Sequence, residues 1–395
     1  MLTILFYVCN VAGPPQGRFH EVRALAASVY ALILVVIVIA ASFRRAEDGG
    51  TVTPFIDWVG TVQLKGIAIL LVIISHLKLL KFISLPYDFS FSGAWGVAIF
   101  LLLSGFGLTQ SYLKNGVSNG FFKKRFSKVV LPYVIVTGIW LAIDAIFLAK
   151  TYSWSTALLA LTGFDLSTSI DPTMWFVTFI ILWYLIFFLV FKLPTRDAVK
   201  LVLLFVFAYL FRNHAALVFP SRIAWQWGLH AYLFPLGALA GLYYRRLSYI
   251  VKPKVLVLCL GVAVIPTFYF FSMYVGKSLD IFENYTWANF AFALGVILLM
   301  AIARFYGLSS KPLVLVGSIS YELYLFEWVF MGKYNLLHAF NGKWLSGLLF
   351  ALVIVALSIS LRRFKTIVVS WCCKTTSDPL IGARIGQELL LVHKK

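Results

Sequence analysis

Two ionisable side chains, Lys65 and His76, lie in one apolar stretch of the sequence, eleven positions apart. At about 100° per residue, that spacing places both on the same face of a helix, with a rise between them of about 16 Å. Ionisable groups are costly inside a membrane helix and often mark functional sites there. Histidine titrates near neutral pH, so His76 is a candidate general base for a hydroxyl group. Two simpler alternatives stay open, a structural hydrogen bond for His76 and a basic helix end for Lys65.

Two carboxylates, Glu322 and Glu327, lie in a later apolar segment, next to Tyr321. Five positions correspond to about 500° on a helix, so the two carboxylates face about 140° apart and at least one is expected to face the bundle interior. Either of them is a candidate to orient His76, as carboxylates orient histidines in other sites. No His, Asp or Glu lies three or four positions from His76, so we expect no metal site there.

A basic run rich in phenylalanine, residues 121–133, contains Arg125 and Lys128. Arginine can bind a phosphate through two parallel hydrogen bonds and lysine acts as a point charge, so the run is a candidate phosphate site. The simpler alternative is an in-plane helix that anchors lipid head groups. Earlier in the chain, Ser104 and Gly105 allow the close approach of another helix or of a ligand.

The composition indicates an integral membrane protein. Of 395 residues, 61% are hydrophobic and 12% are charged, whereas a soluble chain carries about 25% charged residues. The net charge of +19 is expected from Lys and Arg in cytoplasmic loops. We predict no nucleic-acid partner, because no basic-aromatic module accompanies this charge.

The apolar runs predict an all-α fold, a polytopic bundle of about eleven transmembrane helices. The runs cover residues 24–43, 61–82, 93–113, 128–149, 173–192, 198–212, 228–244, 254–274, 286–305, 313–332 and 342–361. We therefore expect three parts: an N-terminal segment, 1–60, with one extra helix; a ten-helix core, 61–361; and a basic cytoplasmic tail, 362–395.

The Lys and Arg distribution gives the helices a direction. If the run 61–82 leads from the cytoplasm outward, the cytoplasmic loops hold 19 Lys and Arg and the outer loops hold ten. This orientation follows the positive-inside rule and places Lys65 and the C-terminus at the cytoplasmic side, with His76 toward the outside. The outer loops carry acidic residues, including Asp165 and Asp171. The longest of them, 150–172, mixes aromatic and hydroxyl residues, which favours a membrane interface over a sugar site.

Five segments follow one another in a fixed order: the Lys65–His76 pair, Phe100–Phe106 ending in Ser-Gly-Phe, the Arg125–Lys128 pair before Pro132-Tyr133, Trp175-Phe176, and Ser320–Leu325. Together they resemble the acyltransferase-3 family of membrane acyltransferases, whose members O-acetylate surface polysaccharides, lipopolysaccharide and peptidoglycan. The resemblance covers about residues 61–361. Three positions depart from the family pattern: Lys65 and Lys128 stand in place of arginines, and Glu327 stands where many members have histidine.

The resemblance implies an acyl-CoA donor, most often acetyl-CoA, taken from the cytoplasm, and a hydroxyl acceptor on a saccharide or lipid-linked glycan outside. It implies a bacterial inner membrane, no bound cofactor and contact with membrane lipid. His76 would be the catalytic residue, acting as general base on the acceptor hydroxyl or on a covalent relay. Donor binding would fall to Lys65, Arg125, Lys128 and Ser104. Orientation of His76 or contact with the acceptor would fall to Glu327, Glu322, Tyr321 and Trp175.

Two functions of other classes stay open. A transporter or flippase for a lipid-linked saccharide predicts substrate movement without acyl-CoA, and the lack of an internal sequence repeat argues against it. A non-catalytic membrane partner of a polysaccharide assembly complex predicts that His76→Ala has no effect.

Overall fold

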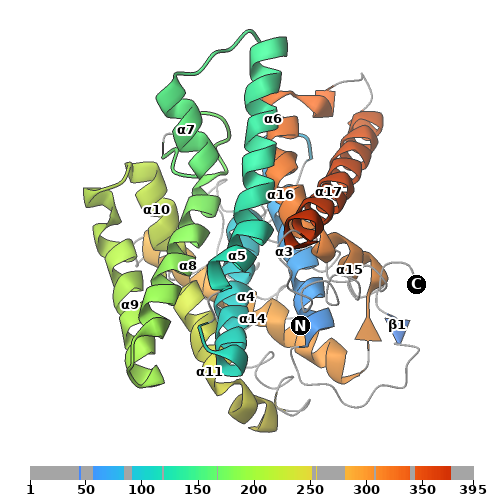
Figure 1. Cartoon of the computed structure of the whole chain (residues 1–395). Coiled ribbons are helices and arrows are strands. Elements are labelled where there is room, and N and C mark those ends of the chain that lie inside the picture. Colours follow the sequence, from blue (N-terminus) through green and yellow to red (C-terminus); the bar gives the residue numbers. More distant parts are fainter. Residues whose placement is uncertain are drawn as a thin grey trace, which may run out of the picture.

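The structure is a computed structural model that describes residues 44–45, 57–83, 91–117, 120–166, 168–250, 255, 281–306, 308–338 and 343–374. These residues form a bundle of helices (Figure 1), which confirms the predicted all-α class. A two-residue antiparallel pair joins β1 (Arg44–Arg45) to β2 (Leu308–Ser309). Among the described residues, six helical segments are long and apolar enough to cross a membrane, or seven if a bent pair forms one span. The predicted span 24–43 lies outside these ranges, and so does the predicted span 254–274 except for residue 255.

The centre of the bundle is α4 (Ser92–Asn115), which packs between α3 (Trp58–Leu79) and α11 (Leu233–Ile250). Glycine makes the α4–α11 contact possible, because a Cβ on Gly105 would lie 2.1 Å from the carbonyl oxygen of Phe234. Small residues at such crossings let two backbones approach closely. Close packing through Gly105 therefore holds α4 against α11.

The predicted span 313–332 is a bent pair of helical segments. It consists of α15 (Lys311–Ser318) and α16 (Ser320–Trp328), which continues into the π-helical turn η6 (Val329–Lys333), and the two parts are bent by 66°. The first part is fixed against α3, because a Cβ on Gly317 would lie 1.8 Å from the carbonyl oxygen of Val62. The bend then lets α16 take a different direction while still packing against α3.

The basic run does not form a separate in-plane helix. Instead α5 (Phe121–Arg125), the π-helical turn η2 (Phe126–Val130) and α6 (Leu131–Phe147) make one continuous apolar segment. Pro132 follows closely on this π-helical turn, and because proline has no N–H to donate to the preceding turn, it suits a point where the regular helical hydrogen bonding is interrupted. The loop expected over 150–172 contains a short helix, α7 (Trp154–Thr162), which Ser153 caps by accepting a hydrogen bond from the Thr156 amide.

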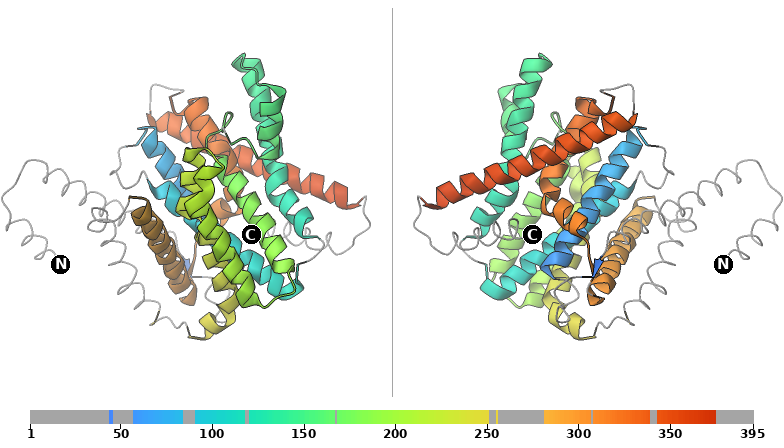
Figure 2. Two further views of the ribbon diagram at one scale, coloured as in Figure 1. Left: turned by 90° about the vertical axis from the view of Figure 1, so that its left-hand side faces the viewer. Right: turned by 90° about the vertical axis from the view of Figure 1, so that its right-hand side faces the viewer.

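The remaining helices complete the bundle. They are α8 (Trp175–Lys192), α9 (Asp197–His214) with the 3-10 turn η3 (Ala215–Leu217), α10 (Ser221–His230), α14 (Ile281–Phe305), the 3-10 turn η7 (Leu336–His338) and α17 (Lys343–Lys374). The predicted span 228–244 begins in α10 and is interrupted before α11. The last helix, α17, lies obliquely across the bundle (Figure 2) and runs thirteen residues past the predicted end at 361.

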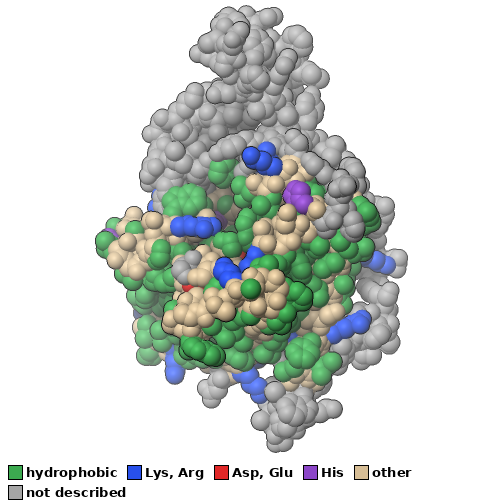
Figure 3. Space-filling view, turned by 90° about the horizontal axis from the view of Figure 1, so that it is seen from above, with side chains coloured by type: hydrophobic (Ala, Val, Ile, Leu, Met, Phe, Trp, Pro, Cys, Tyr) green, Lys and Arg blue, Asp and Glu red, His purple; other side chains and the backbone are tan. Residues whose placement is uncertain are grey.

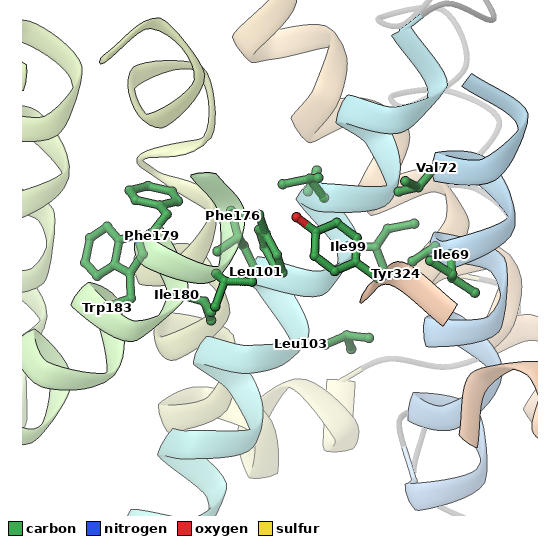
Figure 4. Close-up of a cluster of buried hydrophobic side chains, with 14 of the residues drawn as sticks. Ile69, Val72, Ile99, Leu101, Leu103, Phe176, Phe179, Ile180, Trp183 and Tyr324 are labelled. Carbon is green, nitrogen blue, oxygen red and sulfur yellow. The ribbon is translucent and has the colours of Figure 1, made fainter. Parts of the chain in front are cut away.

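The core joins α3, α4, α8 and α16. Side chains of Ile69, Ile99 and Phe179 are fully buried there, and Tyr324 is buried beside them (Figure 4). Large apolar side chains also remain on the exterior, such as Phe147, which is 76% exposed. Figure 3, a view from the end where α7 lies, shows hydrophobic side chains over much of the surface with separate Lys and Arg among them. The many exposed apolar side chains along the helices suit a hydrocarbon surrounding rather than water.

Candidate active site

His76 pairs with Glu327 across the interface between α3 and α16. The imidazole Nδ1 lies 2.7 Å from Oε1 of Glu327, and the His76 ring also meets the Trp328 ring edge-on, with centroids 4.6 Å apart. Glu327 is fully buried and the His76 side chain is 15% exposed. An ionised carboxylate at this distance holds the proton on Nδ1, which leaves the Nε2 lone pair as the basic site. The pair thus has the arrangement of an oriented general base.

A second buried carboxylate, Asp171, lies close to this pair in the loop before α8. Its Oδ1 accepts hydrogen bonds from the backbone N–H of Thr173 at 2.8 Å and from the Thr173 hydroxyl at 2.7 Å. The pKa of Asp171 is raised to about 6: burial is the largest cause, the Thr173 hydrogen bonds oppose the rise, the negative charge of Glu327 adds to it and His76 opposes it. The Tyr324 hydroxyl of α16 donates to the Thr173 carbonyl, which fastens this loop to the helix that carries Glu327.

Each of the two carboxylates leaves one oxygen unused. Oε2 of Glu327 and Oδ2 of Asp171 are buried and have no hydrogen-bond partner among the described residues. A buried acceptor without a partner costs about 1–3 kcal/mol, and more when it is charged. Both oxygens are therefore available to a hydroxyl group that enters the site. The sequence placed Asp171 in an acidic outer loop but did not indicate that it belongs to this site.

The other end of α3 carries a group of cations. Lys65 lies within electrostatic range of Lys128, Arg125 and Glu322. Arg125 lies over the rings of Phe121 and Tyr184, at 5.7 and 5.5 Å from their centroids, and its Nε is buried without a hydrogen-bond partner in the described part of the chain. Like charges held together at low dielectric repel each other, and an anion relieves that repulsion. This end is suited to an anionic group.

A small cavity adjoins Arg125. Its lining includes Arg125, Lys124, Ser111 and Tyr112, and we call it the Arg125 cavity. Ser104 is not part of the lining, although it lies on α4 one turn before Leu108, which is. The structure therefore brings Arg125 to a cavity and places Ser104 nearby on the same helix face.

One comparison with known proteins gives a match. The chain matches a family model described as an acyltransferase domain over residues 54–363. The chain belongs to the acyltransferase-3 family. With its apolar helices, it is therefore an integral membrane protein and a membrane acyltransferase. Neither the comparison with curated proteins nor the comparison with solved structures gives a match.

In this acyltransferase, three of the four side chains predicted to orient His76 or to contact the acceptor make contacts with residues other than His76. Glu322 binds Lys365 of α17 at 2.5 Å, and Tyr321 donates a hydrogen bond of 2.9 Å to the Val129 carbonyl, so both belong to the end that carries Lys65. Trp175 stacks on the buried His230, with ring centroids 5.8 Å apart.

Glu327 therefore has a different partner from Glu322. Within the described residues, Glu327 is the one predicted orienting residue that contacts His76. Lys65 and His76 share one unbroken helix, α3, so the predicted rise of about 16 Å between them holds in the structure.

Proposed function

We propose that this acyltransferase moves an acyl group, most simply acetyl, from acyl-CoA on the cytoplasmic side to a hydroxyl group of a saccharide or lipid-linked glycan on the other side. The observation that carries the proposal is the buried contact between His76 Nδ1 and Glu327 Oε1, at one end of the helix that has Lys65 near its other end. We propose a bacterial cytoplasmic membrane as its location, with the C-terminus inside.

The donor would enter at the basic end of α3. Lys65, Arg125 and Lys128 bring three positive charges to this end, and these charges suit the phosphates of a CoA molecule. Of the three, Arg125 also lines the Arg125 cavity. Ser104 would contact the donor further along the same face of α4. The rise from Lys65 to His76, about 16 Å, is of the order of an extended pantetheine arm. The thioester would then reach His76 while the phosphates stay at the basic end.

The transfer would be a general-base reaction. His76 Nε2 takes the proton of the acceptor hydroxyl while the hydroxyl oxygen attacks the thioester carbonyl carbon. The carbon–sulfur bond then breaks, and the leaving sulfur takes the proton from the imidazolium. The products are an ester on the acceptor and CoA as a free thiol. Glu327, fully buried beside Nδ1, stabilises the imidazolium that forms between these two steps.

The direct test is mass spectrometry of surface glycans from cells with and without the protein. The proposal predicts that deletion removes an acyl mass from one glycan and that the wild-type gene restores it. Membranes that contain the protein should also release CoA from acetyl-CoA. Unchanged glycan acylation together with no CoA release would contradict the proposal and would favour a transporter or a non-catalytic partner.

A further inference from the structure

A second cavity lies between α6, α7 and the loop that leads to α8. Its lining includes Tyr133, Thr137, Trp140, Asp165 and Asp171, and we call it the Asp171 cavity. It has room for a group of about the size of one water molecule. In Figure 1, α7 and the adjoining part of α6 lie at the same end of the bundle. A cavity of this size can hold one hydroxyl group of a larger molecule.

Two residues that line this cavity each carry a buried polar atom without a hydrogen-bond partner among the described residues. The atoms are Nε1 of Trp140 and Oδ2 of Asp171, on side chains that are each 1% exposed. The indole N–H can only donate a hydrogen bond, whereas the carboxylate oxygen can accept one. A hydroxyl group offers one donor and acceptor lone pairs, so it complements both atoms at once.

The charges around the cavity exclude other occupants. Its charged lining residues are Asp165 and Asp171, so an anion would be repelled. The nearby Lys333 contacts the Ile170 carbonyl, but its charge is paired with Asp144. A metal or ammonium cation has no lone pair to accept the Trp140 N–H. An uncharged hydroxyl group is the ligand that can form hydrogen bonds with both Trp140 Nε1 and Asp171 Oδ2.

The cavity is next to the proposed base. Asp171 lies within electrostatic range of both His76 and Glu327. The Trp140 ring packs edge-on against Phe326, the residue before Glu327, with ring centroids 5.8 Å apart. The cavity and the His76–Glu327 pair therefore lie in the same part of the bundle.

We propose that the Asp171 cavity is a specificity pocket for a second, non-reacting hydroxyl group of the acceptor. Trp140 Nε1 donates a hydrogen bond to that oxygen and Asp171 Oδ2 accepts its proton in a hydrogen bond. The inference rests on the proposed function and narrows the class of acceptor. The acceptor carries at least two hydroxyl groups close together, as an uncharged sugar ring does, and a single isolated hydroxyl is rejected. A site built to pair a substrate hydroxyl discriminates strongly against molecules that lack it.

The test uses the Trp140→Phe variant, which removes the N–H and keeps most of the ring. Membranes that contain the full-length protein are supplied with radiolabelled acetyl-CoA, and two rates are measured: transfer of label to the membrane glycan and hydrolysis of acetyl-CoA to acetate. We expect Trp140→Phe and Asp171→Asn to lower transfer about tenfold or more, the factor expected when one buried hydrogen bond is lost. The KM for acetyl-CoA should stay unchanged in both variants, and in Trp140→Phe hydrolysis should stay unchanged as well.

Trp183 provides a matched control. Its Nε1 is also buried without a partner among the described residues, but Trp183 does not line the cavity. Trp183→Phe should therefore keep the wild-type transfer rate, and thermal unfolding of each variant checks that it folds. Equal transfer by Trp140→Phe and Trp183→Phe would overturn the inference and leave a buried water as the occupant. An equal loss of transfer and hydrolysis in Trp140→Phe would also overturn it. A wild-type protein that shows neither reaction would overturn the proposed function itself.

Discussion

His76 and Glu327 are 251 positions apart in the sequence, yet Nδ1 of one lies 2.7 Å from Oε1 of the other. The packing of α15 against α3 explains how this contact forms. Gly317 and Gly66 bring the two backbones together, because a Cβ on Gly66 would lie 2.5 Å from the Leu313 carbonyl oxygen. The 66° bend after α15 then directs α16, and Glu327 with it, toward the far end of α3. The proposed catalytic geometry therefore depends on close helix packing and on a break in the helix.

The carboxylate of Glu327 can be tested by Glu327→Gln. The amide keeps the size of the side chain but removes the charge that stabilises the imidazolium, so we expect kcat for acyl transfer to fall by about 10²-fold or more. Glu322→Gln is the matched control, because Glu322 is a buried carboxylate on the same helix that binds Lys365 instead of His76. Similar losses of kcat in both variants would show that Glu327 supports the folded structure and does not act on His76 specifically.

The basic end of α3 can be tested by Lys65→Gln. Loss of one charge-assisted contact to a phosphate should raise the KM for acetyl-CoA about tenfold and leave kcat nearly unchanged. Lys65→Arg keeps the charge and should restore much of the affinity. Lys123→Gln, an exposed change in the same basic region that does not line the Arg125 cavity, should leave the KM unchanged. A KM of Lys65→Gln equal to that of the wild type would exclude a donor role for Lys65.

The close packing of α4 against α11 predicts different effects for two glycines on one helix. A Cβ at Gly105 would meet the backbone of α11, whereas a Cβ at Gly107 would meet nothing within 4 Å. Gly105→Ala should therefore reduce stability by about 1–3 kcal/mol, the usual cost of overpacking. Gly107→Ala should cause no loss, because alanine favours the helix. Thermal unfolding of the two purified variants in detergent measures the difference, and equal unfolding temperatures would contradict the packing.

Asp171 should make stability depend on pH. The pKa of Asp171 in the folded protein is raised to about 6; burial is the largest cause, and this value includes the effects of Thr173, Glu327 and His76. In the unfolded chain the pKa is about 3.9. The folded protein therefore favours the neutral carboxyl. This contribution is fully present below about pH 3.9 and is lost as the pH rises through about 6.

The Asp171→Asn variant separates this effect, because its side chain is uncharged at every pH. Near pH 8 it should be more stable than the wild type, by about 3 kcal/mol at most, and the difference should shrink toward pH 4.5. Thermal unfolding at the two pH values measures it. The same difference at both pH values would show that the carboxylate of Asp171 is not destabilised by burial. Together with the expected loss of transfer, the result would mark Asp171 as a residue that costs stability and serves the reaction.

Much of the architecture could be predicted because long apolar runs have few ways to fold in a membrane. The Lys65–His76 register was predictable for the same reason, since α3 is one regular helix. The angle of about 140° between Glu322 and Glu327 predicted that the two face different ways, and they bind Lys365 and His76, respectively. The sequence did not show which Glu faces His76, because that choice depends on the bend after α15.

The place of Asp171 could not be predicted. It lies in a loop 95 positions from His76, and its approach depends on the hydrogen bond from Tyr324 to Thr173, which joins two distant segments. Local patterns such as periodicity carry no information about that contact. The orientation of Trp140 toward the same cavity depends likewise on how α6 packs beside α7 and the following loop.

The most direct test of the central claim is the rate of acyl transfer by His76→Ala in membranes, with its expression and its thermal unfolding matched to the wild type. Loss of the general base should reduce transfer from acetyl-CoA to the glycan by about 10²-fold or more, with little change in the KM for acetyl-CoA. Transfer by His76→Ala at close to the wild-type rate would contradict the account, because no base would then be needed at the far end of α3.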